Sequence, residues 1–169
     1  KMLIDIFSAP DFDLIKLSDV MSYYHGVVEV EPVKSTWASS REDIDKGLQF
    51  LSWSDPENPI HTWQRNLYDL ALLEVKAVKP DHPRWKLVRE KMDIASSSDH
   101  FWWASAKPWW SLEMIEFGAF CLLDTIRHVP DVSKKALEKG LGYYEKIVTT
   151  AFNWQRTGKI RQMMQEQQT

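Results

Sequence analysis

Nine of the 169 residues are tryptophan, and this content constrains what the chain can fold into. Each large aromatic side chain carries about 150–250 Å² of surface. Nine exposed indoles would therefore present roughly 1,300–2,200 Å² of apolar area, whereas monomeric proteins rarely expose apolar patches above a few hundred Å². Most of the tryptophans must be buried in a core, or some of them line a binding surface.

The rest of the composition is typical of one globular domain. Charged residues make up 27% and apolar residues 44% of the chain, and a chain of this length usually folds around a single core. The net charge is −3, with 21 basic and 24 acidic side chains, so we expect no nucleic-acid partner. The stretch 94–112 is almost uncharged but contains Asp99 and Lys107, so we expect no contact with a membrane.

The sequence contains no recognisable cofactor or metal motif. Its five histidines are far apart and Cys121 is the single cysteine, so neither a metal site nor an internal disulfide is predicted. The six glycines form no phosphate-binding or dinucleotide-binding pattern, and we expect no cofactor. Cys121 lies in an apolar run and is predicted to be a small buried residue. We expect a cytoplasmic protein.

Hydrophobic periodicity predicts a mainly α fold, with a bundle of about four main helices. Apolar residues recur at helical spacing over 60–77, and a second stripe ends at Ala95. Residues 109–128 are apolar nearly all round, which is typical of a helix at the centre of a bundle. Residues 132–156 form a last amphipathic helix. Three tryptophans fall on packed helix faces: Trp63, Trp85 and Trp154.

The beginning of the chain has a different pattern, which predicts a short α/β segment. Residues 12–17 alternate and predict a strand, a helix is expected over 19–24, and residues 27–33 are expected to be extended. We therefore divide the chain into a terminal α/β segment, residues 1–36, and a helical bundle domain, residues 37–169.

The segment 96–110 has no clean period and places aromatic residues beside polar ones. A sugar ring has apolar C–H faces that stack on aromatic planes and a hydroxyl rim that needs polar partners. A concave aromatic site with a few polar groups therefore suits a carbohydrate. The segment contains four tryptophans: Trp102, Trp103, Trp109 and Trp110. The alternative is that they are core residues where the chain crosses the bundle, and composition favours this alternative for two of the four. Asp99 would then cap a short helical turn.

The same segment resembles a motif of glycoside hydrolase family 57. Ser98-Asp99-His100-Phe101-Trp102-Trp103 is similar to the Ser-Asp-Trp-Phe-Trp-Trp motif of that family. Ser35-Thr36-Trp37 resembles the Gly-Ser-Trp element that opens the helical region of the family. Residues 54–58 followed by Trp63 resemble the pattern at its next helix, and residues 12–24 resemble the strand and helix that end its barrel domain.

This resemblance implies a larger enzyme that acts on an α-glucan or related oligosaccharide. In that family an incomplete β/α barrel carries a glutamate nucleophile and an aspartate acid, and a helical bundle closes one side of the cleft. No stretch of this chain matches either catalytic motif, so we predict no catalytic residue here. The expected partners are the carbohydrate and an upstream barrel domain, and the chain alone is expected to be inactive.

Six residues are predicted to bind substrate: Asp99, His100, Trp102, Trp103, Trp37 and Trp109. The resemblance assigns Asp99 to a sugar hydroxyl or to anchoring of the loop, and it assigns Trp37 and Trp102 to the cleft. His100 stands where the family has tryptophan. A smaller, titratable ring at this position would change a subsite, so the identity of the sugar stays open.

Two other functions are compatible with the sequence. The first is a non-catalytic helical module whose aromatic side chains form a flat, projecting patch for a protein partner. The second is a free-standing enzyme that uses Glu113 and Glu116, which lie on one helix face and can approach the separation of about 5–5.5 Å found in retaining glycosidases. This second function requires both carboxyl groups in one pocket, whereas glutamates on a thin polar stripe are usually just solvated.

Overall fold

The computed structural model of the chain describes residues 15–24, 26, 28–107 and 109–166. The chain divides into two units, Lys1–Val33 and Lys34–Thr169. This break lies close to the boundary that the sequence predicts after residue 36. The further prediction that residues 1–36 are the end of a barrel domain stays a prediction.

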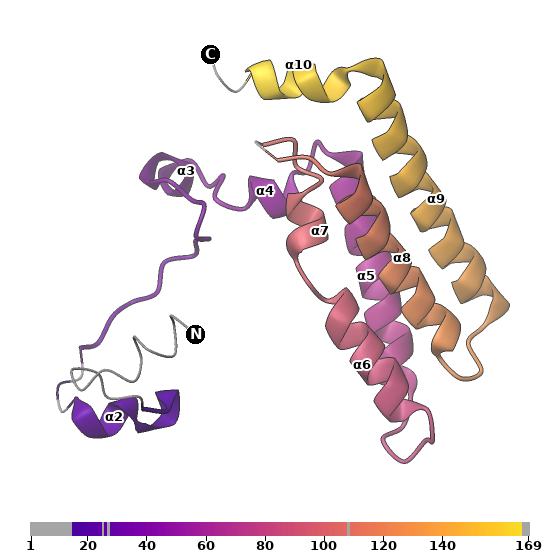
Figure 1. Cartoon of the computed structure of the whole chain (residues 1–169), viewed down its shortest axis with the longest axis horizontal. Coiled ribbons are helices and arrows are strands. Elements are labelled where there is room, and N and C mark those ends of the chain that lie inside the picture. The colour runs from indigo at the N-terminus through magenta and orange to yellow at the C-terminus, as the bar shows by residue number, and fades with distance from the viewer. Residues whose placement is uncertain (1–14, 25, 27, 108, 167–169) are drawn as a thin grey trace, which may run out of the picture. The chain divides into compact units, whose positions relative to one another are not determined.

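The described part of the first unit contains one short helical stretch. A 3-10 turn over Leu17–Asp19 leads into α2, Val20–Tyr23, which confirms the helix predicted at 19–24 (Figure 1). Residues 15–17 of the predicted strand belong to no β-strand, and residues 12–14 lie outside the described residues. The strand is therefore wrong for 15–17, because no strand occurs among the described residues to pair with its backbone.

The second unit is built on four long helices, which confirms the predicted mainly α bundle. They are α5 (Pro59–Ala77), α6 (Trp85–Ala95), α8 (Leu112–His128) and α9 (Lys134–Thr157). Helix α8 packs against each of the other three, and Figure 1 shows it between α6 and α9. The central position expected for the helix over 109–128 is thus confirmed.

Side-chain caps set where three of these helices begin. The Asn58 carboxamide accepts a hydrogen bond from the backbone N–H of Ile60 at 3.0 Å, and Pro59 occupies the first helical position of α5. Ser111 caps α8 and Ser133 caps α9 in the same way. At its other end, α9 stops at Gly158, whose φ of 77° lies in the left-handed region that favours glycine.

The core lies between α5, α8 and α9. Leu67, Ile115, Leu122, Ile126 and Ile147 are fully buried there. The predicted packing of three tryptophans is also confirmed. Trp63 and Trp85 are partly buried against this core, and Trp154 is almost wholly buried. The bundle therefore absorbs part of the tryptophan content as ordinary core.

Four short helices complete the second unit: α3 (Arg41–Asp45), α4 (Leu51–Ser54), α7 (Asp99–Trp102) and α10 (Lys159–Glu166). Helix α4 packs against α5 and α7, α7 packs against α8, and α10 packs against α9. None of the helices in the described part of the chain is both long enough and apolar enough to cross a membrane.

Candidate functional site

Five tryptophans form a connected cluster beside α4 and α7, and we call them the Trp102 cluster: Trp37, Trp53, Trp102, Trp103 and Trp109. Trp102 is its centre, with ring-centroid distances of 5.7 Å to Trp37, 5.1 Å to Trp103 and 5.4 Å to Trp109. Trp53 joins through Trp37, at 6.0 Å and nearly perpendicular. Such tilted and edge-to-face arrangements are the ones that aromatic quadrupoles prefer.

The cluster has an exposed rim and an anchored base. Trp37 is 79% exposed and Trp109 is 47% exposed. Trp102 and Trp103 are half-buried, and Trp103 packs against the hydrophobic core of the bundle. The indoles at the rim are therefore available to a ligand, while the indoles beneath them hold the surface in place.

Trp37 lies in a short hydrogen-bonded turn over Thr36–Ser39. The backbone N–H of Thr36 donates to the Ser39 hydroxyl at 2.8 Å, and the N–H of Ser39 donates to the Thr36 carbonyl at 3.1 Å. The Ser39 hydroxyl also donates to the backbone carbonyl of Gln49 at 3.1 Å. These bonds fix the backbone on both sides of Trp37, and the indole itself is positioned by its ring contacts with Trp53 and Trp102.

The loop that carries Trp103 and Trp109 is tied to the start of α5. The Asn58 amide nitrogen donates to the Ala104 carbonyl at 2.9 Å, and Lys107 Nζ lies 2.9 Å from Asp55 Oδ2. Burial alone would raise the pKa of Asp55, but the hydrogen bond from Lys107 and the N–H of Glu57 outweigh burial and lower that pKa. The carboxylate is thus held ionised as an anchor for the loop.

His61 also connects the start of α5 to α7 through hydrogen bonds. Its Nδ1 accepts a hydrogen bond from the backbone N–H of Asp55 at 3.0 Å, so Nε2 carries the proton and donates to the Phe101 carbonyl at 2.9 Å. The ring is buried, and burial lowers its pKa to about 4. His61 is therefore a neutral side chain that links the start of α5 to α7 by two hydrogen bonds.

The structure corrects the prediction for His100, which is buried in the bundle instead of lining a cleft. Only 4% of its surface is exposed. Gln64 Nε2 donates to the backbone carbonyl of His100 at 2.8 Å and lies 3.2 Å from its Nδ1, and Gly118 of α8 leaves the space that the ring fills. Burial lowers the pKa of His100 to about 4. Its surroundings thus assign it to packing, because α7 turns this position inward.

Asp99 is exposed, and its backbone carbonyl accepts a hydrogen bond from the N–H of Trp103 at 2.9 Å, but the hollow that it lines contains none of the cluster indoles. It sits in the first turn of α7 and accepts a hydrogen bond from the Ser97 hydroxyl at 3.3 Å. With His100 it lines a small hollow of about 60 Å³, whose other walls include Ile94, Phe117 and Cys121. Of its two expected roles, this local contact favours anchoring of the loop. Cys121 itself is half-buried against the core, and burial raises the pKa of its thiol.

Four of the six predicted residues therefore come together, namely Trp37, Trp102, Trp103 and Trp109. Trp53 also belongs to the cluster although the sequence does not predict it, because it lies in a four-residue helix that is too short to show a periodic pattern. Trp110 is separate from the cluster: it stacks on Trp154 at 6.0 Å and donates from Nε1 to Gln155 at 2.7 Å. Trp110 is also packed against the core, as Trp103 is, so two of the four tryptophans between 102 and 110 serve partly as core.

Glu113 and Glu116 do not share a pocket. Glu116 accepts a hydrogen bond from the Tyr144 hydroxyl of α9 at 2.6 Å, and this bond raises the pKa of Tyr144 to about 12. Glu113 is exposed and borders a different hollow, beside Trp110 and Arg161. None of the five hollows described is lined by both carboxylates, as a free-standing enzyme with this pair would require.

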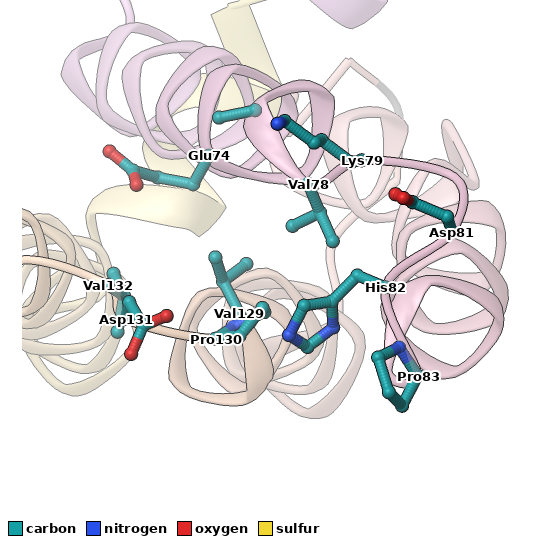
Figure 2. A pocket seen from close by; sticks show the side chains of 11 residues that line it. Glu74, Val78, Lys79, Asp81, His82, Pro83, Val129, Pro130, Asp131 and Val132 are labelled. Carbon is teal, nitrogen blue, oxygen red and sulfur yellow. The ribbon is translucent and has the colours of Figure 1, made fainter.

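A separate hollow of about 560 Å³ lies at the opposite end of the bundle, where α5 and α8 end. Figure 2 shows Val78 and Val129 facing each other across it, with Asp131 on one side and Asp81 and His82 on the other. Its lining mixes both signs of charge and contains no tryptophan, tyrosine or phenylalanine. It therefore lacks the aromatic walls that suit a carbohydrate.

No metal centre accompanies these features in the residues that the structure describes, because no three His, Cys, Asp or Glu side chains are close enough to share an ion. Comparison with protein-family models, with curated proteins and with solved structures finds no significant match to this chain. The resemblance to family 57 therefore stays a prediction, and the site rests on its geometry.

Proposed function

We propose that the Trp102 cluster is a carbohydrate-binding surface for an α-glucan or related oligosaccharide. The observation that carries the proposal is the pairing of exposed Trp37 and Trp109 with half-buried Trp102 and Trp103 beneath them. Flat aromatic faces on a rigid base can stack against the apolar faces of successive sugar rings with little loss of side-chain entropy.

In this proposal the chain is the C-terminal helical part of a family-57-like glycoside hydrolase. The bundle closes one side of the cleft, and the catalytic carboxylates belong to an upstream barrel. Support comes from the resemblance of residues 98–103 and from the way the Asp55–Lys107 ion pair and His61 hold the aromatic loop rigid. We also propose a cytoplasmic location. The chain alone then binds sugar without cleaving it.

The test is an NMR titration of the ¹⁵N-labelled chain with maltoheptaose, followed through the nine indole N–H signals. We expect the signals of Trp37 and Trp109 to shift, and those of Trp63 and Trp85 to stay in place because these side chains pack against the core. The β-linked cellohexaose serves as the control sugar. An absence of indole shifts with maltoheptaose contradicts the proposal, and cleavage of maltoheptaose or amylopectin by the chain alone contradicts the expected inactivity.

One observation favours a second function, a surface that binds a protein partner. One hollow is lined by Thr36 and Ser52, the sequence neighbours of Trp37 and Trp53, instead of by the indoles themselves, and Trp37 is 79% exposed. A flat aromatic patch is typical of protein interfaces as well as of sugar platforms. The same titration separates the two functions, because a protein-binding patch gives no saturable response to maltoheptaose.

A further inference from the structure

Helix α8 buries one face in the bundle and exposes two phenylalanines on the opposite face. It lies between α6 and α9 and also packs against α5 (Figure 1). Ile115, Leu122 and Ile126 are fully buried on the packed face. On the opposite face Phe117 is 55% exposed and Phe120 is 41% exposed. The helix at the centre of the bundle therefore presents aromatic side chains to the solvent.

Apolar side chains of the two flanking helices extend this patch. Ile94 of α6 is 67% exposed and lines the same small hollow as Phe117. Leu141 of α9 is 40% exposed and lies one turn from Tyr144, whose hydroxyl donates to Glu116 of α8. We call the four apolar residues the Phe120 face: Ile94, Phe117, Phe120 and Leu141. They expose roughly 300–450 Å² of apolar surface, which is about half of what each partner buries in a stable protein interface.

Charged residues of opposite sign lie at the two ends of the exposed face of α8. Five residues form the stripe, spaced alternately four and three apart as in the seam between two packed helices: Glu113, Phe117, Phe120, Asp124 and Arg127. Glu113 and Arg127 are exposed, and each lies seven residues from Phe120, which is about 10 Å along the helix. Neither makes an ion pair with another described residue, whereas Asp124 is paired with Lys91 at 2.6 Å. The stripe thus has one unpaired charge of each sign, at equal distances from its apolar centre.

We propose that the Phe120 face binds the same face of a second copy of this chain, with the two α8 helices antiparallel about a twofold axis at Phe120. In a twofold interface the same patch serves both subunits, so a contact from one residue to another occurs twice. The antiparallel arrangement places each Glu113 beside the partner's Arg127, and the two Phe120 rings meet on the axis. A parallel arrangement would instead place like charges together at both ends. The helix dipoles favour the antiparallel arrangement as well.

This inference is independent of the proposed function, because none of these residues belongs to the Trp102 cluster. Its test is sedimentation equilibrium of the full 169-residue chain, which we expect to dimerise. Glu113→Arg and Arg127→Glu each convert both ion pairs of the dimer into repulsive pairs, and either should raise the dissociation constant about tenfold or more. Asp69→Arg makes the same charge reversal at an exposed position of α5 and is the control, with an unchanged dissociation constant.

A mixture of the two charge variants tests the antiparallel arrangement itself. One variant then carries arginine at both ends of the stripe and the other carries glutamate at both ends, so the mixed dimer has two attractive pairs. We expect equal amounts of the two variants to associate about as tightly as the unchanged chain, although each variant alone associates weakly. A mixture that associates no more tightly than the single variants overturns the antiparallel pairing.

A neutral substitution tests the apolar centre without changing the charge of α8. Phe120→Ser shortens an exposed side chain, so the fold should be retained, and it removes the contact on the twofold axis. We expect the dissociation constant to rise about tenfold or more, and unchanged association overturns the assignment of this face. An unchanged chain that stays monomeric up to about 1 mM overturns the self-association altogether, and the Phe120 face then belongs to a different protein partner.

Discussion

Gly118 of α8 lies directly against the imidazole of His100: a β-carbon built on Gly118 would be only 2.3 Å from both Cβ and Cγ of His100. Real Cβ atoms do not approach other carbons so closely. The helix therefore needs glycine at this point, and the packing of α7 on α8 depends on the absence of a side chain there.

Substitution of Gly118 by alanine should lower the stability of the bundle. The added methyl group displaces the His100 ring, and overpacking of this kind typically costs about 1–3 kcal/mol, which exceeds the gain in helix propensity. Urea unfolding followed by circular dichroism measures the effect. Gly142→Ala on α9 is the matched control, because a β-carbon at Gly142 would have nothing within 4 Å. That change should stabilise the chain by about 0.5–1 kcal/mol. Equal effects of the two substitutions would contradict the packing argument.

The ion pair between Asp55 and Lys107 should contribute more to stability than the ion pairs on the helix surfaces. The side chain of Asp55 is 9% exposed and that of Lys107 is 32% exposed. Lys107→Met leaves a largely buried carboxylate without its cation, and we expect a loss of about 1–3 kcal/mol in the free energy of unfolding. The control is Arg89→Met, which breaks an exposed i,i+4 pair with Asp93 and should cost under about 0.5 kcal/mol. A similar loss of unfolding free energy in both variants would contradict the anchoring role of Asp55.

Stability should fall in mild acid because of His61 and His100. Burial lowers both pKa values to about 4, whereas an unfolded histidine has a pKa of about 6.5. Between these values the unfolded state binds protons that the native state excludes. The contribution of each histidine to the free energy of unfolding is therefore fully present above about pH 6.5 and is lost as pH falls towards 4. This contribution is on the order of 3 kcal/mol per histidine.

Urea unfolding at several pH values between 7.5 and 4 checks this expectation. His61→Gln and His100→Gln should each reduce the slope of unfolding free energy against pH, whatever their absolute stability. Gln165→Ala changes an exposed, non-titrating residue of α10 and serves as the control with an unchanged slope. An identical slope in the unchanged chain and in both core variants would show that neither imidazole is held neutral.

The sequence predicts the bundle well because its helices are long and amphipathic. The apolar stripes of α5 and α9 repeat over several turns, so their period identifies them without knowledge of tertiary contacts. The strand expected at 12–17 fails at 15–17 because alternation over a few residues predicts a pattern of burial but supplies no pairing partner.

The candidate site is predicted only in part, for a physical reason. Sequence can show that aromatic residues are concentrated at 102–110, but contacts between distant segments decide which of them are exposed. The burial of His100 depends on Gln64 and Gly118, which lie far from it in the chain. The contact of Trp53 with Trp37 depends likewise on how α4 and the turn at 36–39 pack together.

Substitution of Trp37 and substitution of Trp102 should have different effects on sugar affinity and on the free energy of unfolding. Trp37 is mostly exposed, so Trp37→Ala should change the free energy of unfolding by less than about 1 kcal/mol while it removes an outer stacking face. Trp102 contacts three other indoles from a half-buried position, so Trp102→Ala should weaken maltoheptaose binding and also cost a few kcal/mol of stability, up to the range of about 3–5 kcal/mol for a core tryptophan.

Calorimetry with maltoheptaose and urea unfolding measure the two effects on the same samples. Phe152→Ala, which removes an exposed aromatic ring of α9 outside the cluster, is the control and should leave sugar affinity unchanged. If Trp102→Ala lowers stability and retains full affinity, Trp102 is a core residue. If Trp37→Ala also retains full affinity, the rim of the cluster does not bind sugar, because Trp37 is the most exposed of the nine indoles and the first that a ligand would meet.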